Sequence, residues 1–317
     1  MAEAVVYSIP MAHRFRGITT RVGLVFRGDA GWAEWSPFPE YPPAEAAQWL
    51  RAAREAADQG YPAPRRVAIP VNSTIPAVDP VTAYALAARA GCRTAKVKVA
   101  EPGQTLADDE ARVEAVRAAL GRAGKLRIDA NGGWTLDEAR RALTVLGRYD
   151  LEYAEQPCRE TADLARLRRA QSVPVAADES IRRAEDPFVV KRLGAADIVV
   201  LKVQPLGGVR ACLRLAEALG LDVVVSSALE TSVGLRAGLA LAAALPELKY
   251  ACGLATLSLL TADVVAEPLV ARDGQIDVRD IVVDDARLAA VRADDQTTAT
   301  WRARLACATR EAPWTIS

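Results

Sequence analysis

The chain repeats one short pattern from about residue 71 onward, and this repeat constrains the fold more than any other feature. A run rich in β-branched residues is followed by a polar or glycine-containing stretch and then by a helical segment. Successive runs begin about 23 to 31 residues apart, the length of one strand and one helix with short loops. The eight runs are VNSTIPA (71–77), TAKVKVA (94–100), KLRIDANG (125–132), LEYAEQP (151–157), PVAADES (174–180), DIVVLKVQP (197–205), DVVVSSALET (222–231) and YACGLATL (250–257).

Eight strands that alternate with helices favour a closed (β/α) barrel over an open sheet. No glycine-rich dinucleotide turn follows the first run, as an open nucleotide-binding sheet would require. Helix signals stand between the runs: Thr135 precedes a helical segment with Glu138 three positions on, which is a capping pattern. The segment GGVRACLRLAEALG (207–220) begins and ends with glycine, as a bounded helix does.

Residues 1–68 differ from the repeat and predict a separate α+β capping domain. AVVYSIP, ITTRVGLVFRG and GWAEWSPF indicate an antiparallel meander with a turn at Gly28–Asp29, and AEAAQWLRAAREAADQG indicates a helix after it. We expect this domain to cover one end of a barrel formed by residues 69–258. Residues 259–317 contain no ninth repeat, and we expect them to pack back on the cap or the barrel.

Charge and residue counts exclude several classes of function. The 40 basic and 40 acidic side chains balance, which gives no reason to expect nucleic acid or a membrane surface as partner. The first residues lack a basic stretch followed by a long apolar one, so we expect a soluble cytoplasmic protein acting on a small molecule. His13 is the only histidine, so acid–base chemistry falls to lysines and carboxylates. The five scattered cysteines show no CxxC spacing and predict reduced core residues.

Three consecutive runs end in a carboxylate. Asp129, Glu155 and Asp178 lie 26 and 23 residues apart, one repeat each, so barrel geometry brings them to the same rim. Each could instead cap the helix that follows, but three in phase favour a shared site. Oxygen ligands without histidine or thiolate suit Mg²⁺, or Mn²⁺ in its place, better than zinc. Asn131 is either a neighbour of that metal site or a turn residue before two glycines.

Lysines flank these carboxylates. In TAKVKV, Lys96 and Lys98 share one face of a strand and small apolar residues share the other, so the lysine face is either wet or an active site. Lys202 stands in the otherwise apolar run VVLKVQP, where an unpaired ammonium would be costly. The alternative for Lys202 is a side chain that reaches the rim of the barrel.

TAKVKV, IDANG, EQP, AADES and VLKVQPLGG occur in an order and spacing that resemble the enolase superfamily, in its muconate lactonizing subgroup. The resemblance covers nearly the whole chain and implies a modified TIM-type (β/α)7β barrel with an α+β N-terminal capping domain. RFRGITTR, VVVSSALETSVGL and YACGLATL are most similar to the o-succinylbenzoate synthases of actinobacterial type. These enzymes of menaquinone biosynthesis dehydrate 2-succinyl-6-hydroxy-2,4-cyclohexadiene-1-carboxylate to 2-succinylbenzoate.

The resemblance also implies roles for the residues at the strand ends. The three carboxylates would bind Mg²⁺, which accepts the substrate carboxylate and stabilises an enediolate. Lys98 would remove the proton and deliver it to the departing hydroxyl, Lys96 would disfavour the charged form of Lys98, and Lys202 would stabilise negative charge. Ser226 and Gly253 would lie near the succinyl carboxylate. Arg14 and Arg16 would belong to a cap loop over the site, unless they form only a solvated charge cluster.

Several related reactions compete with this interpretation. Dipeptide epimerases carry Asp-x-Asp where this chain has Gly253, Leu254 and Ala255, and mandelate-type racemases need a histidine base. N-succinylamino acid racemization uses the same two lysines and stays open, although Pro205 stands where promiscuous members often have arginine. Muconate cycloisomerase is a further alternative. A Schiff-base aldolase using Lys202, or a barrel that only binds a ligand, represents a different class.

Overall fold

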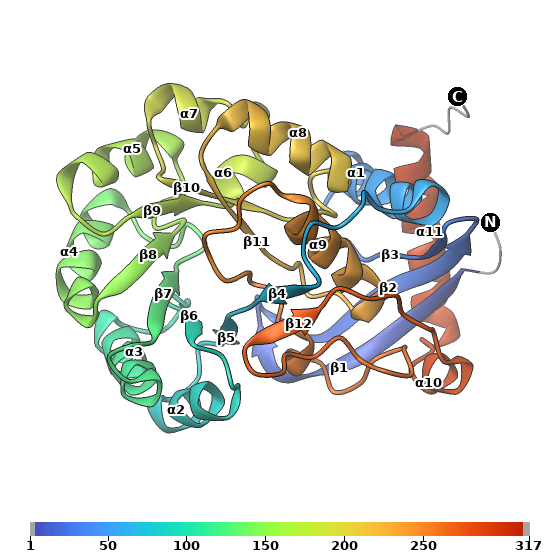
Figure 1. Ribbon diagram of the computed structural model, residues 1–317, viewed down its shortest axis with the longest axis horizontal. Coiled ribbons are helices and arrows are strands. Elements are labelled where there is room, and N and C mark those ends of the chain that lie inside the picture. The colour runs from blue at the N-terminus through green and yellow to red at the C-terminus, as the bar shows by residue number, and fades with distance from the viewer. Residues whose placement is uncertain (1–3, 313–317) are drawn as a thin grey trace.

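The computed structural model describes residues 4–312, and its N-terminal part is a three-stranded antiparallel sheet beside a helix (Figure 1). The turn between the second and third strands falls at residues 29 and 30, so the predicted meander and its turn at Gly28–Asp29 are confirmed. The elements are β1 (Val5–Phe15), β2 (Ile18–Gly28), β3 (Gly31–Trp35), α1 (Pro43–Arg54) and the short π-helix η1 (Glu55–Gln59).

A curved, all-parallel sheet of seven strands follows, with its strands in sequence order from β5 to β11. The strands are β5 (Ser73–Ile75), β6 (Thr94–Lys98), β7 (Lys125–Asp129), β8 (Leu151–Glu155), β9 (Val175–Ala177), β10 (Ile198–Leu201) and β11 (Asp222–Val225). The helices between and after them are α2 (Pro80–Arg89), α3 (Leu106–Leu120), α4 (Leu136–Leu146), η2 (Gly147–Tyr149), α5 (Thr161–Ala170), α6 (Glu179–Arg182), α7 (Val189–Leu193), α8 (Val209–Leu219) and α9 (Ser232–Ala244).

The eighth repeat closes the sheet with two residues instead of a full strand. Cys252 forms a parallel bridge to Val71, before β5, and Gly253 forms one to Ser226, after β11. The backbone N–H of Cys252 donates to Pro70 (2.7 Å) and that of Gly253 to Val225 (2.8 Å), so this segment joins both edges of the sheet. The predicted barrel is therefore confirmed. Its eighth strand consists only of the bridging pair Cys252 and Gly253, and the run YACGLATL that contains them is poor in β-branched residues.

The helix boundaries follow the predicted caps. Thr135 caps α4 in a reciprocal capping box with Glu138, and α8 lies between Gly208 and Gly220. The chain after the barrel contains η3 (Leu257–Leu259), β12 (Gln275–Asp277), α10 (Asp285–Ala290) and α11 (Asp295–Glu311). Strand β12 pairs with β4 (Ala68–Pro70), at the start of the barrel.

Two main hydrophobic clusters divide the molecule. One lies between the barrel strands and their helices, and the other joins the N-terminal sheet to α1 and α11. Trp35 of β3 meets Trp301 of α11 edge to face at 5.5 Å. Residues 313–317 of the C-terminal segment lie outside the described residues. Between residues 4 and 312 no helix is both long and apolar enough to cross a membrane.

A buried carboxyl joins the N-terminal sheet to the barrel. Glu34 of β3 accepts hydrogen bonds from the backbone N–H of Thr231 (3.1 Å), which caps α9, and of Gly234 (3.1 Å), and from Tyr7 Oη (2.8 Å). Burial, reinforced by the nearby Glu230 carboxylate, raises the pKa of Glu34 from 4.5 to about 7. The folded state therefore holds this proton more tightly than the unfolded state, and ionisation of Glu34 weakens the interface.

This carboxyl predicts a fall in stability as the pH rises. The stabilisation is fully present below the ordinary pKa of 4.5 and is lost as the pH passes through about 7. As the pH rises from about 5 to about 8, the unfolding free energy of the wild type should fall. In Glu34→Gln, which cannot ionise, the fall should be smaller by about 1 to 3 kcal/mol. Urea denaturation of both proteins across this range measures the difference, and parallel curves would contradict the assignment.

Candidate active site

The two lysines of TAKVKV lie on the inner face of β6, inside the barrel. Lys96 is 5% exposed and Lys98 is 9% exposed, so their shared face is buried and not wet. The alternating residues Ala95, Val97 and Val99 pack in the cluster between the strands and the helices. The alternation in the sequence therefore separates a charged interior from an apolar exterior of the same strand.

The three predicted carboxylates meet the lysines at the carboxyl ends of adjacent strands. In the sheet register, Lys98 pairs with Asp129 on β7, and Asp129 pairs with Glu155 on β8. Asp178 follows β9, and Lys202 follows β10. All three carboxylates are at most 1% exposed. The one-repeat spacing thus becomes a ring of ionisable groups at one end of the barrel.

Every carboxylate in this ring is paired with a cation. Lys98 Nζ lies 2.6 Å from Asp129 Oδ2, and Lys96 Nζ lies 2.8 Å from Glu155 Oε2 and 3.4 Å from Asp129 Oδ2. Lys202 Nζ donates to Asp178 Oδ2 at 2.6 Å. The other oxygen of Asp178 accepts from Arg182 Nε at 2.8 Å. Pairing of this kind is what permits so many charges to be buried together.

The pairing sets the protonation of the carboxylates. Burial would raise the pKa values of Asp129 and Asp178, but the cations beside them reverse the shift and hold both below their usual range. Glu155 differs, because burial and the Asp129 carboxylate together raise its pKa to about 7 despite the contact with Lys96. Glu155 is thus the carboxyl of the ring that takes up a proton most readily.

The two lysines on β6 differ in the same way. Burial lowers the pKa of Lys98, and the Lys96 ammonium contributes to that fall, against the opposing effect of Asp129. Burial alone would also lower the pKa of Lys96, but Glu155 and Asp129 overcome it and raise the value. Lys98 is thus the lysine whose neutral, basic form is more accessible, chiefly because of its burial.

The oxygen atoms of this ring are suited to a hard divalent cation. Within residues 4–312, no three histidine, cysteine or acidic side chains form a ready-made metal cluster, because ammonium groups lie among the carboxylates. The donors nevertheless fit Mg²⁺, because they are carboxylate oxygens on adjacent strands. Burial, together with repulsion from the Asp129 carboxylate, raises the pKa of Glu155. A cation would relieve that repulsion.

Asn131 lies beside this ring, in a turn and in contact with one of the lysines. Its backbone adopts a left-handed φ of 46°, as a turn residue can, and its Oδ1 accepts from Lys98 Nζ at 2.5 Å. Its Nδ2 donates to Glu179 Oε1 at 3.1 Å. Sequence reasoning missed Glu179 and Arg182, although Arg182 stands at the helical i+4 position from Asp178.

A small cavity of about 30 Å³ lies beside the ring and is lined by its three lysines and by Asp129, but not by Glu155 or Asp178. Three cap residues, Phe15, Arg16 and Phe38, contribute to its wall, although the motifs on the barrel strands gave no signal for the two phenylalanines. The remaining lining residues come from the barrel: Thr74, Lys96, Lys98, Asp129, Asn131, Lys202, Ser226, Ser227, Ala228, Leu229 and Thr256. Lys98 and Asn131 also border an outer cleft of about 670 Å³.

The residues predicted to contact substrate are divided between these spaces. Ser226 and Arg16 line the inner cavity, and Arg14 lines only the outer cleft. Gly253 is buried behind Ser226, and a Cβ added to it would lie only 2.5 Å from Ser226 Oγ. Glycine at 253 therefore lets the segment that closes the barrel, Cys252 and Gly253, approach Ser226 closely.

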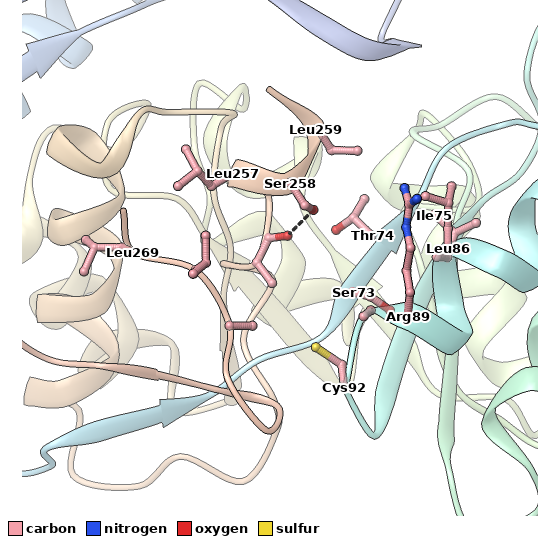
Figure 2. A pocket seen from close by; sticks show the side chains of 14 residues that line it. Ser73, Thr74, Ile75, Leu86, Arg89, Cys92, Leu257, Ser258, Leu259 and Leu269 are labelled. Carbon is pink, nitrogen blue, oxygen red and sulfur yellow. Dashed lines mark hydrogen bonds between the residues drawn. The ribbon is translucent and has the colours of Figure 1, made fainter. Parts of the chain in front are cut away.

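A second cavity, of about 370 Å³, adjoins the first, and Figure 2 shows the side chains that line it. It separates β5 and α2 from the segment around Leu257, and Arg89 is the one charged residue among those that line it. Thr74 lines both cavities. Of these two cavities, only the first is lined by the lysines of the ring and by Asp129, which marks it as the candidate active site.

Comparison with known proteins agrees with this architecture. A family model described as enolase C-terminal domain-like matches residues 81–282, and one described as enolase N-terminal domain-like matches residues 6–57. The muconate lactonizing enzyme of Pseudomonas fluorescens, solved with muconolactone, superposes with a TM-score of 0.80 at 26% identity, covering 92% of this chain and 98% of that one.

Curated relatives are closer in sequence. An o-succinylbenzoate synthase of Thermobifida fusca (strain YX) is 61% identical over 302 residues, which span 95% of this chain and 94% of the relative. Another, from Mycobacterium marinum (strain ATCC BAA-535 / M), is 53% identical over 91% of this chain and 88% of its own length. The chain therefore belongs to the enolase superfamily and, within it, to the family of the o-succinylbenzoate synthases.

Proposed function

We propose that this chain is a hydro-lyase that converts 2-succinyl-6-hydroxy-2,4-cyclohexadiene-1-carboxylate into 2-succinylbenzoate and water, a step of menaquinone biosynthesis. The observation that carries the proposal is the placement of Lys98 and Lys202, both buried, on one cavity that Asp129 of the carboxylate ring also lines. The 61% identity to an o-succinylbenzoate synthase supports the reaction. No histidine lies at this ring, so lysine is the base available to it.

Lys98 performs the proton transfers. In its neutral form it removes the proton from the ring carbon that bears the carboxylate. The electron pair left on that carbon forms a ring double bond while the bond to the neighbouring hydroxyl breaks. The Lys98 ammonium then gives the same proton to the departing hydroxyl, which leaves as water, so one lysine serves as base and acid on one face of the substrate.

Lys202 acts without transferring a proton. Its ammonium donates to Asp178 and faces the same cavity, so it places fixed positive charge near the negative charge that develops on the substrate. A Schiff-base aldolase would instead need the neutral amine of this lysine as a nucleophile. Lys202 Nζ instead lies 2.6 Å from Asp178 Oδ2 in an ion pair, an arrangement that suits the electrostatic role.

We propose Mg²⁺ as the cofactor, with Mn²⁺ as a substitute, held by Asp129, Glu155 and Asp178. Bound there, the ion would supply charge for the substrate carboxylate and for the electron density that builds up beside it. Lys96 neutralises Glu155 and disfavours the charged form of Lys98. Asn131 orients the Lys98 amine from the edge of the ring.

The cap and the closing segment provide the substrate contacts in this proposal. Arg16 of the cap lines the inner cavity, and its guanidinium stacks 4.4 Å from the centre of the Phe38 ring. Ser226, supported by Gly253, and Arg16 would bind the succinyl part of the substrate. Residues 1–68 would then act as a cap on a catalytic barrel of residues 69–258, with 259–317 bracing both.

N-succinylamino acid racemization is the second candidate, because Lys98 and Lys202 both line the cavity and could serve opposite faces of a substrate. Muconate cycloisomerization is a third. Incubation with N-succinylamino acids of both hands, beside the dehydration assay, distinguishes the first two reactions. Racemization without dehydration would replace the proposed function.

The lysines predict a specific pattern of activity loss. Lys98→Ala and Lys202→Ala should each lower kcat for dehydration by about 10²-fold or more, because each removes a group that acts in the transition state. Lys125→Ala, an exposed lysine at the opposite end of β7, is the matched control and should retain wild-type activity. Unchanged turnover in both active-site variants would contradict the proposal.

Metal removal gives an independent prediction. EDTA should abolish dehydration, and Mg²⁺ should restore it. Mg²⁺ should also raise the Tm of the metal-free wild type by a few degrees, because a ligand that binds only the folded state stabilises it. The rise should be smaller in Glu155→Gln, which lacks one of the proposed metal ligands. Activity that persists in EDTA, as a Schiff-base enzyme would show, would count against the carboxylate ring as a metal site.

A further inference from the structure

The loop after β11 forms one wall of the inner cavity through Ser226, Ser227, Ala228 and Leu229. Leu229 adopts a left-handed backbone conformation, with φ of 63°, that residues other than glycine rarely occupy. Such a conformation costs free energy and persists only where surrounding contacts hold it. The wall of the cavity therefore depends on whatever fixes this turn.

Hydrogen bonds to barrel side chains hold the backbone N–H groups of the turn, but not the carbonyl groups of Ala228 and Leu229. The N–H of Leu229 donates to Ser227 Oγ (2.9 Å), and the N–H of Ala228 donates to Glu230 Oε2 (2.7 Å). Ser227 Oγ itself donates to the same Glu230 oxygen at 2.6 Å. The carbonyl groups of Ala228 and Leu229 point to a different partner.

That partner is Arg21, which lies on β2 in the N-terminal domain and is 1% exposed. Its Nε donates to the carbonyl of Leu229 (2.7 Å) and its Nη2 to that of Ala228 (3.2 Å). The same guanidinium also donates to the backbone carbonyls of Ser36 and Val22, within the cap. Since a guanidinium is a rigid fork of donors, it fixes the turn and the cap relative to each other.

Arg21 also packs against a second part of the cavity wall. Its guanidinium lies 4.6 Å from the centre of the Phe38 ring, and Phe38 lines the same cavity from the cap side. None of the salt bridges within residues 4–312 includes Arg21. Its charge is thus directed to backbone carbonyls on two sides of the active site.

We infer that Arg21 is a positioning residue: from the cap, it holds residues 226–229 and Phe38 in the arrangement that fits the substrate. It does not touch the reacting atoms. The inference rests on the proposed function for its kinetic test, because substrate binding is what a displaced wall would impair.

The test is Arg21→Lys, which keeps the charge but loses the fork. We expect KM for the hydroxycyclohexadiene carboxylate to rise by about tenfold or more while kcat changes by less than about threefold. Amide hydrogen exchange of the segment around residues 226–231 should become faster in the variant without substrate. A variant with a lower Tm but unchanged KM and unchanged exchange would overturn the inference, because Arg21 would then be only structural.

Arg117 offers a matched control. It also donates from Nη2 to the carbonyl of a left-handed residue, Asp150 (3.1 Å, φ of 53°), but at the entrance to β8, the opposite end of the barrel. Arg117→Lys should leave KM unchanged. An equal rise in KM in both variants would mean that loss of any such clamp impairs the enzyme, which would contradict a specific role for Arg21.

A double-mutant cycle with Ser226→Ala locates the effect. If Arg21 acts through the turn, the rise in KM should be smaller when Ser226 is already absent; additive effects would contradict the inference. Should Arg21→Lys not fold, Glu230→Gln loosens the same turn from the barrel side and is judged by the same KM and exchange criteria. A wild type without dehydratase activity would overturn the proposed function alone, because the exchange measurement still tests Arg21.

Discussion

The structure depends on mutual neutralisation of buried charges at the carboxyl ends of five neighbouring strands. Three carboxylates and three lysines lie inside the barrel at exposures of at most 9%, where unpaired charges would be prohibitively costly. Each is tolerated because a group of opposite sign stands on the next strand or two, as in the pair of Lys98 with Asp129 at 2.6 Å. Removing one partner would leave an uncompensated charge, so these positions are fixed together.

The same arrangement prepares the chemistry. The cations hold Asp129 and Asp178 ionised, whereas burial and the Asp129 carboxylate leave Glu155 with a pKa of about 7. A divalent cation bound beside Glu155 would favour the ionised form of this carboxyl. Burial also lowers the pKa of Lys98, so a basic amine becomes available without a histidine.

Much of this was predictable from the sequence, for a physical reason. Strand–helix repeats fix which residues stand at strand ends, so Asp129, Glu155 and Asp178 could be assigned to one rim from their spacing alone. What could not be predicted were contacts between segments far apart in the chain. Arg21 reaches Leu229 across 208 positions, and neither residue type signals the contact. The eighth strand, reduced to two bridging residues, was likewise visible only in the structure.

The most direct test of the account is a crystal structure of the protein with Mg²⁺ and 2-succinylbenzoate. The account predicts the ion on oxygens of Asp129, Glu155 and Asp178, and the product in the cavity between Lys98 and Lys202. It also predicts that the lysine ammonium groups leave the carboxylates to make room for the metal and turn toward the product. An ion bound elsewhere, or product bound in the neighbouring cavity around Arg89, would contradict it.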